Sequence, residues 1–152
     1  MAKLIKPYKD INDTVRHIRL QVEHSIPFAA EVCPTFDHPA QLFRWLKDRL
    51  IYRKDPNGRE LLQTMQTLWH GEYYGIPGAG DCDCFSITAL ACCYIQEWRG
   101  PLWIKLAGRS KSAPVHIWSG IDWNGKEYAV DLTNKTPDHE RHYPIIQRLE
   151  FK

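Results

Sequence analysis

The chain has 152 residues, of which 43% are hydrophobic and 25% charged, and its formal net charge is +2 at pH 7. These values are ordinary for one domain that buries about two-thirds of its unfolded surface, so we expect a single domain over residues 1–152. Basic and acidic residues are interspersed rather than gathered in runs, which argues against nucleic-acid binding.

The sequence carries no sign of export or of membrane insertion. Its first residues lack the apolar core of a secretion signal, and no stretch approaches the ~18 apolar residues of a membrane span. Five cysteines, an odd number with Cys92 and Cys93 adjacent, are typical of reduced thiols rather than of a disulfide framework. We therefore expect a cytoplasmic protein with no signal peptide and no membrane partner.

The first half of the chain predicts mainly helices. Residues 12–24 fit either a helix or a strand, and the two prolines in 25–38 predict a loop. Pro39 begins an amphipathic helix, and Asp55-Pro56-Asn57-Gly58 predicts a turn. Residues 61–69 follow helical spacing, with an apolar stripe that we expect in the core rather than around a ligand.

The second half predicts one buried helix and an antiparallel sheet, which together make an α+β layout. Three glycines and a proline in 73–80 predict a flexible approach to the helix, and 136–143, with His139 and His142, predicts surface. Gly108 to Pro114 predicts a link between strands. The apolar run of the helix spans residues 85–98, and the strands are expected over 102–106, 115–123, 126–133 and 145–151.

Asn124-Gly125 fixes the register of the last predicted hairpin. This pair favours a two-residue type I′ turn, because both positions need positive φ. Trp123 then opposes Lys126. The pairs that follow on the same, mostly apolar, core-facing side are Ile121 with Tyr128, Ser119 with Val130 and Ile117 with Leu132.

The opposite face of this hairpin carries His116, Trp118 and Asp131. In the predicted register Trp118 lies across from Asp131, and His116 is its diagonal neighbour at about 5–8 Å, within reach of a hydrogen bond. A slip of one residue would separate the two side chains. The alternative is a polar pair of little consequence on the solvated side of a hairpin.

Cys82 lies just ahead of the buried helix. Gly80 frees the backbone there and Asp81 is a candidate N-cap, which places Cys82 in the first turn. Unpaired N–H groups and the helix dipole favour a thiolate at this position, and the same N–H groups are candidates for an oxyanion site. With His116 as base and Asp131 orienting it, these residues predict a thiol acyl-transfer site.

The remaining cysteines offer alternatives. Cys84 competes with Cys82, but it continues into the apolar run and is better explained as a buried hydrophobe. Cys92 and Cys93 are assigned to packing, and Cys33 has no evident partner. Zinc held by these thiols and His70 is disfavoured, because the spacing is not the usual Cys-x2-Cys and residues inside a buried helix converge poorly. Calcium at Asp81 and Asp83 is weaker still, since the surrounding loop lacks oxygen-rich spacing.

These motifs resemble the transglutaminase-like superfamily of papain-fold thiol enzymes. Gly80-Asp81-Cys82, His116-Ile117-Trp118 and Asp131-Leu132-Thr133 follow the order and form of its motifs. Residues 45–60 and the run around Cys82 resemble its small branch in bacteriophages and prophages. The resemblance spans about residues 40–135, and it departs from the family where Cys84 replaces a second aspartate.

The resemblance implies a papain-like fold: N-terminal helices, with the cysteine helix packed on an antiparallel sheet. It implies catalysis by Cys82, His116 and Asp131, without metal or cofactor. Trp118, Trp69 and Tyr74 are the candidate substrate contacts, and Trp69, Tyr74 and Gln66 are candidates for an oxyanion helper.

Two functions are therefore expected as alternatives. The first is thiol-dependent acyl transfer on an amide bond of a protein or peptide, as in a cysteine peptidase, amidase or transglutaminase. The second is a structural or interaction protein, such as a phage particle component contacting other phage proteins, that keeps the fold with weak or no activity. The second places the chain in a virion rather than free in the cytoplasm.

Overall fold

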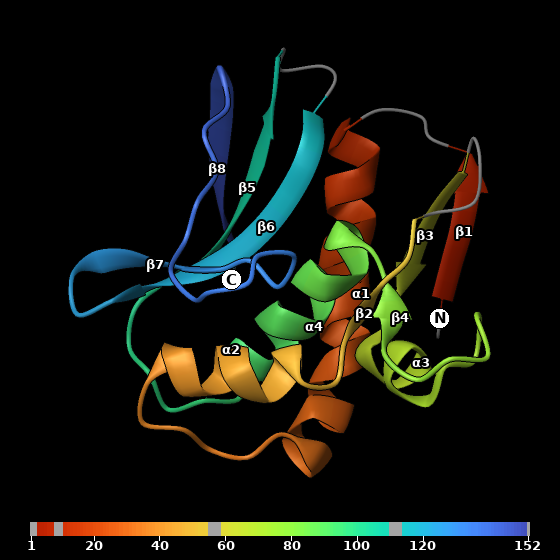
Figure 1. Ribbon diagram of the computed structural model, residues 1–152, viewed down its shortest axis with the longest axis horizontal. Helices are drawn as coiled ribbons and strands as arrows, with labels where there is room; N and C mark the ends of the chain where they lie inside the picture. Colours follow the sequence, from red (N-terminus) through yellow and green to blue (C-terminus); the bar gives the residue numbers. More distant parts are fainter. Residues whose placement is uncertain (1–2, 8–10, 55–58, 110–113, 152) are drawn as a thin grey trace.

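The computed structural model describes residues 3–7, 11–54, 59–109 and 114–151 (Figure 1). The predicted turn at 55–58 and the centre of the predicted link before residue 114 lie outside this range. The elements in chain order are β1 (Lys3–Pro7), α1 (Ile11–Val32), α2 (Pro39–Lys47), β2 (Ile51–Tyr52), β3 (Arg59–Gln63), α3 (Met65–His70), β4 (Ala79–Gly80), α4 (Cys82–Tyr94), β5 (Leu102–Gly108), β6 (Pro114–Trp123), β7 (Lys126–Val130) and β8 (Ile145–Phe151).

The main sheet has four strands in the order β7-β6-β5-β8, and every neighbouring pair is antiparallel. Two small ladders lie outside it, β1 antiparallel to β3 and β2 parallel to β4. The described helices thus precede the main antiparallel sheet in the chain, which confirms the predicted α+β class.

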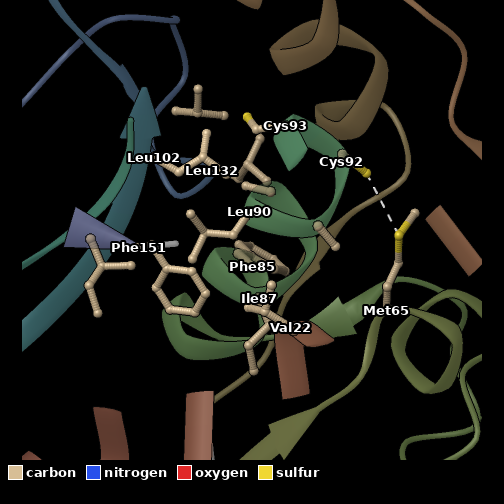
Figure 2. Close-up of a cluster of buried hydrophobic side chains, with 14 of the residues drawn as sticks. Val22, Met65, Phe85, Ile87, Leu90, Cys92, Cys93, Leu102, Leu132 and Phe151 are labelled. Carbon is tan, nitrogen blue, oxygen red and sulfur yellow. Dashed lines mark hydrogen bonds between the residues drawn. The ribbon is translucent and has the colours of Figure 1, made fainter. Parts of the chain in front are cut away.

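Helix α4 lies between the sheet and α1 and forms the centre of the core (Figure 1). Every residue from Asp83 to Cys93 is buried, as expected for a helix that is apolar on nearly all sides. Figure 2 shows side chains of α4 in this cluster together with Val22 of α1 and with Leu102 and Phe151 of the sheet.

The predicted hairpin is present in the predicted register. Ser119 pairs with Val130, Ile121 with Tyr128 and Trp123 with Lys126, and Asn124 and Gly125 have φ of 51° and 80°. The ladder ends at Val130, so the expected pairs beyond it are not formed as strand pairs. The core-facing residues of the expected pairs are buried or partly buried: Ile117, Ile121, Val130, Leu132 and Tyr128.

Two predictions for the first half were wrong. Residues 12–24 are helical, but the helix continues through Pro27 to Val32, where a loop was expected. Buried contacts outweigh the proline, because Val22 and Ala29 belong to the core and Ser25 accepts a hydrogen bond from the backbone N–H of Met65.

Residues 61–69 do not form one helix. Leu61 and Leu62 lie in β3, Thr64 caps α3, and only Met65–His70 is helical. The apolar stripe is nevertheless part of the core, as expected, with Leu61, Leu62, Met65 and Leu68 all buried. Helix α4 ends at Tyr94, four residues earlier than expected, and His139 and His142 are exposed, as predicted.

We predict that Gly120→Ala destabilises the sheet. A Cβ on Gly120 would lie 2.3 Å from the Trp103 ring and 2.4 Å from the Tyr128 carbonyl oxygen, too close for either group to accept. We expect a loss of about 1–3 kcal/mol in the free energy of unfolding, measured with urea. The control Lys126→Ala, at an exposed position of the same hairpin, should change the free energy of unfolding little. An unchanged free energy of unfolding in Gly120→Ala would contradict the close packing of Trp103 on Gly120.

Candidate active site

Asp81 caps α4 as predicted. Its Oδ1 accepts hydrogen bonds from the backbone N–H groups of Asp83 (3.1 Å) and Cys84 (3.4 Å), and Cys82 is the first residue of the helix. These two N–H groups therefore point to the cap, which argues against their expected role in binding an oxyanion. The cap fixes the first turn, and with it the position of the Cys82 side chain.

Cys82 differs from the other four thiols in its exposure. It is half-buried, whereas the other four cysteines are buried. Cys84 donates to the backbone oxygen of Leu61 (3.2 Å) inside a small apolar cluster, which confirms its expected structural position. Of the two candidates for a nucleophile, Cys82 alone can be reached from the surface.

Two of the buried thiols, those of Cys92 and Cys93, are held in the protonated form. Burial raises the pKa of Cys93 to about 12 and holds the pKa of Cys92 well above its ordinary value. Cys92 lies 3.7 Å from the sulfur of Met65 (Figure 2). A hydrogen bond from Cys92 lowers the pKa of Cys33 against the effect of burial, and Gln96 adds to this, but Cys33 is only 8% exposed.

His116 and Asp131 form the predicted hydrogen bond. Nε2 of His116 donates to Oδ2 of Asp131 over 2.7 Å, and the two residues are only 8% and 4% exposed. The pair is therefore buried and is not a decoration of a solvated hairpin face. Because the carboxylate holds the proton on Nε2, the lone pair of a neutral ring lies on Nδ1.

Asp131 is held as a carboxylate. Burial opposes its ionisation, but the hydrogen bond and charge of His116 and two hydrogen bonds from Thr133 outweigh burial and lower the pKa of Asp131. Those two bonds come from the backbone N–H (3.0 Å) and the hydroxyl (2.7 Å) of Thr133. Lys47 of α2 donates to the neighbouring Leu132 carbonyl and adds a positive charge nearby.

Aromatic rings fix the plane of the imidazole. The His116 ring stacks on Trp118 at 5.3 Å and on Tyr143 at 6.1 Å, and the Trp118 indole donates to Glu140 over 2.9 Å. Trp118, a candidate substrate contact, is fully buried. It supports the imidazole and does not line an open surface.

A β-bulge lies directly before His116. Ala107 pairs with His116 and Gly108 with Pro114, so Val115 is the extra residue. Val115 is 71% exposed. Bulges often redirect a side chain beside a functional site, and this one sets the orientation of His116 where β6 begins.

Helix α4 and strand β6 run in the same direction, which brings their starts together. The Ser86 hydroxyl lies 3.5 Å from the Ile117 carbonyl oxygen near the start of β6, while Cys93 lies beside Leu102, the partner of Ile121, at the other end. Ser86 also donates to the carbonyl of Cys82, one turn earlier on the same side of the helix. Cys82 therefore lies at the level of the β6 residues that precede Ile117.

Tyr52 connects the cysteine to a pocket beside the histidine. Its backbone pairs with Gly80, two residues before Cys82, and its ring lies 6.3 Å from that of Phe85. The same tyrosine lines a pocket of about 340 Å³ together with Val115, His116, Thr133, Arg141 and Tyr143. No local pattern in the sequence links Tyr52, Arg141 or Tyr143 to His116, so none of the three was a sequence-derived site candidate.

The sulfur–imidazole contact of a triad is not formed in this structure. Nδ1 of His116 has no hydrogen-bond partner among the described residues, and the ring lies on the face of the sheet that carries Trp118. The Cys82 thiol instead donates to Oδ1 of Asp83 over 3.7 Å. Catalytic contacts of ligand-free enzymes are often long and tighten only with substrate.

The other sequence-derived candidates lie away from this pocket. Trp69 packs on Trp45, the Tyr74 hydroxyl donates to the Lys54 carbonyl, and Gln66 donates to the His24 carbonyl. In the part of the chain that the structure describes, none of the three lines the pocket beside His116. Their proposed roles as substrate contacts or oxyanion helpers gain no support from these positions.

Comparison with known protein families, curated proteins and solved structures gave no match to this chain. Within the described residues, no three His, Cys, Asp or Glu side chains converge as metal ligands. No described helix has both the length and the apolar character needed to cross a membrane.

We predict that Asp131→Asn removes a pH-dependent part of the stability. Because the pKa of Asp131 is lowered on folding, the carboxylate stabilises the fold above its unfolded pKa, and this contribution is lost as the pH falls through the folded pKa. The variant should be less stable by about 1–3 kcal/mol at pH 7, with the difference shrinking below about pH 5. Urea unfolding at several pH values measures this, with exposed Asp37→Asn as control; a constant difference would contradict it.

We predict that Asp83→Asn makes the Cys82 thiol more reactive. The Asp83 carboxylate accepts the thiol proton and repels a negative sulfur, so its removal favours the thiolate. Alkylation of Cys82 by iodoacetamide should accelerate by about fivefold or more. Rates are read by mass spectrometry, again against Asp37→Asn, and an unchanged rate would show that this contact does not restrain the thiol.

Proposed function

We propose that this protein is a thiol enzyme that transfers the acyl group of an amide, acting as a peptidase or amidase. The observation that carries the proposal is the buried hydrogen bond from His116 Nε2 to Asp131. It leaves Nδ1 as a base at a pocket bounded by Tyr52, whose backbone pairs next to Cys82. Membership of the transglutaminase-like superfamily, with its papain-like fold, belongs to the same proposal and is supported by the three motifs.

The roles follow from the chemistry of each group. Nδ1 of His116 takes the thiol proton, and the Cys82 sulfur attacks the carbonyl carbon of the amide. When the C–N bond breaks, the imidazolium gives that proton to the departing amine, and a thioester remains on Cys82. Water then attacks the thioester while Nδ1 takes its proton, and return of this proton to the sulfur regenerates the thiol. An amine in place of water would give transamidation.

Asp131 has a positioning role. It keeps the proton of a neutral imidazole on Nε2 and stabilises the imidazolium that forms during transfer. The stack of Trp118 and Tyr143 on the ring, together with the Thr133 bonds to Asp131, limits the rotation of both groups. A base held in this way loses little entropy when substrate arrives.

Closing the gap between sulfur and imidazole is the step that this mechanism requires. Rotation of the Cys82 side chain away from Asp83 breaks their 3.7 Å contact, which is long for a hydrogen bond to sulfur. Val115, beside the histidine, is exposed and lines the pocket that we assign to the substrate. We therefore expect the reactivity of the Cys82 thiol in solution to depend on His116.

Differential alkylation tests the proposal. Iodoacetamide at neutral pH should label Cys82 much faster than the four buried cysteines, and His116→Ala should slow the labelling of Cys82 by at least about tenfold. Mass spectrometry of digests gives the rate at each cysteine. His24→Ala, at an exposed histidine of α1 that does not line the pocket, is the matched control and should leave every rate unchanged.

The same alkylation measurement can also contradict the proposed thiol mechanism. If Cys82 reacts slowly and His116→Ala has no effect on a protein whose circular dichroism is unaltered, the thiol mechanism is wrong. A structural or interaction protein that keeps the fold is then the better explanation, and it predicts a large interface with a partner.

A further inference from the structure

Arg141 lines the pocket beside His116 from the segment that joins β7 to β8. The other walls are the rings of Tyr52 and Tyr143, the Thr133 side chain and Val115. Arg141 is exposed. It is the one arginine or lysine among the residues that line this pocket in the described part of the chain.

A buried amide holds the Arg141 side chain in place. Nε of Arg141 donates to Oδ1 of Asn134 over 3.0 Å, and Asn134 is buried. Asn134 is itself fixed, because its side chain donates to the His139 carbonyl and its backbone N–H to the Asp131 carbonyl. Arg141 is thus attached to the same turn that carries Asp131.

Within the described residues, no ion pair neutralises the charge of Arg141. No carboxylate of the described residues lies within salt-bridge distance of it, whereas Arg148 and Lys105 each contact at least two acidic side chains. Asp131, in the turn that carries Asn134, is occupied by His116 and Thr133, and Glu140, the sequence neighbour of Arg141, is occupied by Lys105 and Trp118.

An arginine held through Nε keeps its two terminal NH2 groups for a ligand. The planar guanidinium matches a carboxylate, which can accept two parallel hydrogen bonds from it. Arg53 and Lys54, both exposed, follow Tyr52 directly in the sequence and add two positive charges next to this pocket residue along the chain. A pocket of about 340 Å³ accommodates one such group with its side chain.

We propose that this pocket binds a carboxylate of the substrate close to the reacting amide, and that Arg141 determines this specificity. The inference rests on the proposed function, because it places the carboxylate beside His116 and Cys82. The substrate class is therefore an acidic peptide or amide, and the carboxylate belongs either to an aspartate or glutamate side chain or to a free C-terminus.

Three chloroacetyl probes test the inference without knowledge of the natural substrate. Each alkylates a thiolate, with the sulfur displacing chloride to form a thioether. Chloroacetyl-glutamine amide is neutral, chloroacetyl-glutamate amide carries a side-chain carboxylate, and chloroacetyl-glutamine carries only the terminal carboxylate. The quantity measured is the labelling rate at Cys82 for each charged probe, divided by the rate for the neutral one.

We expect at least one charged probe to label Cys82 at least about fivefold faster than the neutral probe does. The ratio should fall to about one in Arg141→Gln and persist in Arg99→Gln, which removes an exposed arginine elsewhere. The charged probe whose labelling rate exceeds that of the neutral probe identifies the source of the carboxylate. A ratio near one in the unchanged protein, or a ratio that survives Arg141→Gln, overturns the inference.

Failure of the proposed function has a different signature. In that case even the neutral probe labels Cys82 no faster than the buried cysteines, and binding is then measured directly. Titration of the Cys82→Ser variant with N-acetyl-glutamate amide and with N-acetyl-glutamine should shift the NMR signal of the Arg141 Nε–H for at least one of them, and neutral N-acetyl-glutamine amide should not. Equal shifts, or none, overturn the carboxylate pocket on their own.

Discussion

The arrangement of the site depends on one hydrogen bond, from Nε2 of His116 to the carboxylate of Asp131, made between two largely buried side chains. Burial makes the bond strong only because the pair is fully matched: Thr133 satisfies the second carboxylate oxygen, and rings on one side of the imidazole exclude solvent. An unmatched carboxylate in that position would be costly. The same bond decides which ring nitrogen carries a lone pair, and so which chemistry the pocket can perform.

The second constraint is the buried helix α4. Because its apolar sides are covered by α1 and by the sheet, it cannot slide without losing core contacts, and its capped first turn is held beside the start of β6. Cys82 is the helical residue at which this core meets the surface. The pocket residues Tyr52 and Arg141 come from distant parts of the chain and meet beside His116, through a two-residue parallel ladder and through the segment after β7.

Local sequence signals predicted the elements that carry strong local chemistry. The Asn124-Gly125 turn set the hairpin register, and Asp81 ahead of an apolar run marked the start of α4. These local sequence signals gave wrong predictions where tertiary packing opposes the local structural preference of the sequence. Pro27 lies inside α1 because Val22 and Ala29 pack in the core, and Leu61 and Leu62 form a strand although their spacing with Met65 is helical. Periodicity does not separate a short buried strand from a helix when both place apolar residues in the core.

The sequence by itself determined the α+β layout, the pairing of His116 with Asp131 and the place of Cys82 at a helix start, because each depends on contacts between neighbouring residues or across one turn of fixed length. Only the tertiary structure decided that this pair is buried, that Trp118 supports the imidazole from within, and that the thiol contacts Asp83 rather than Nδ1. It alone brought Tyr52 and Arg141 to the pocket. These outcomes arise from contacts between segments far apart in the chain, whose geometry is fixed by close packing of the whole core and leaves no periodic trace in the sequence.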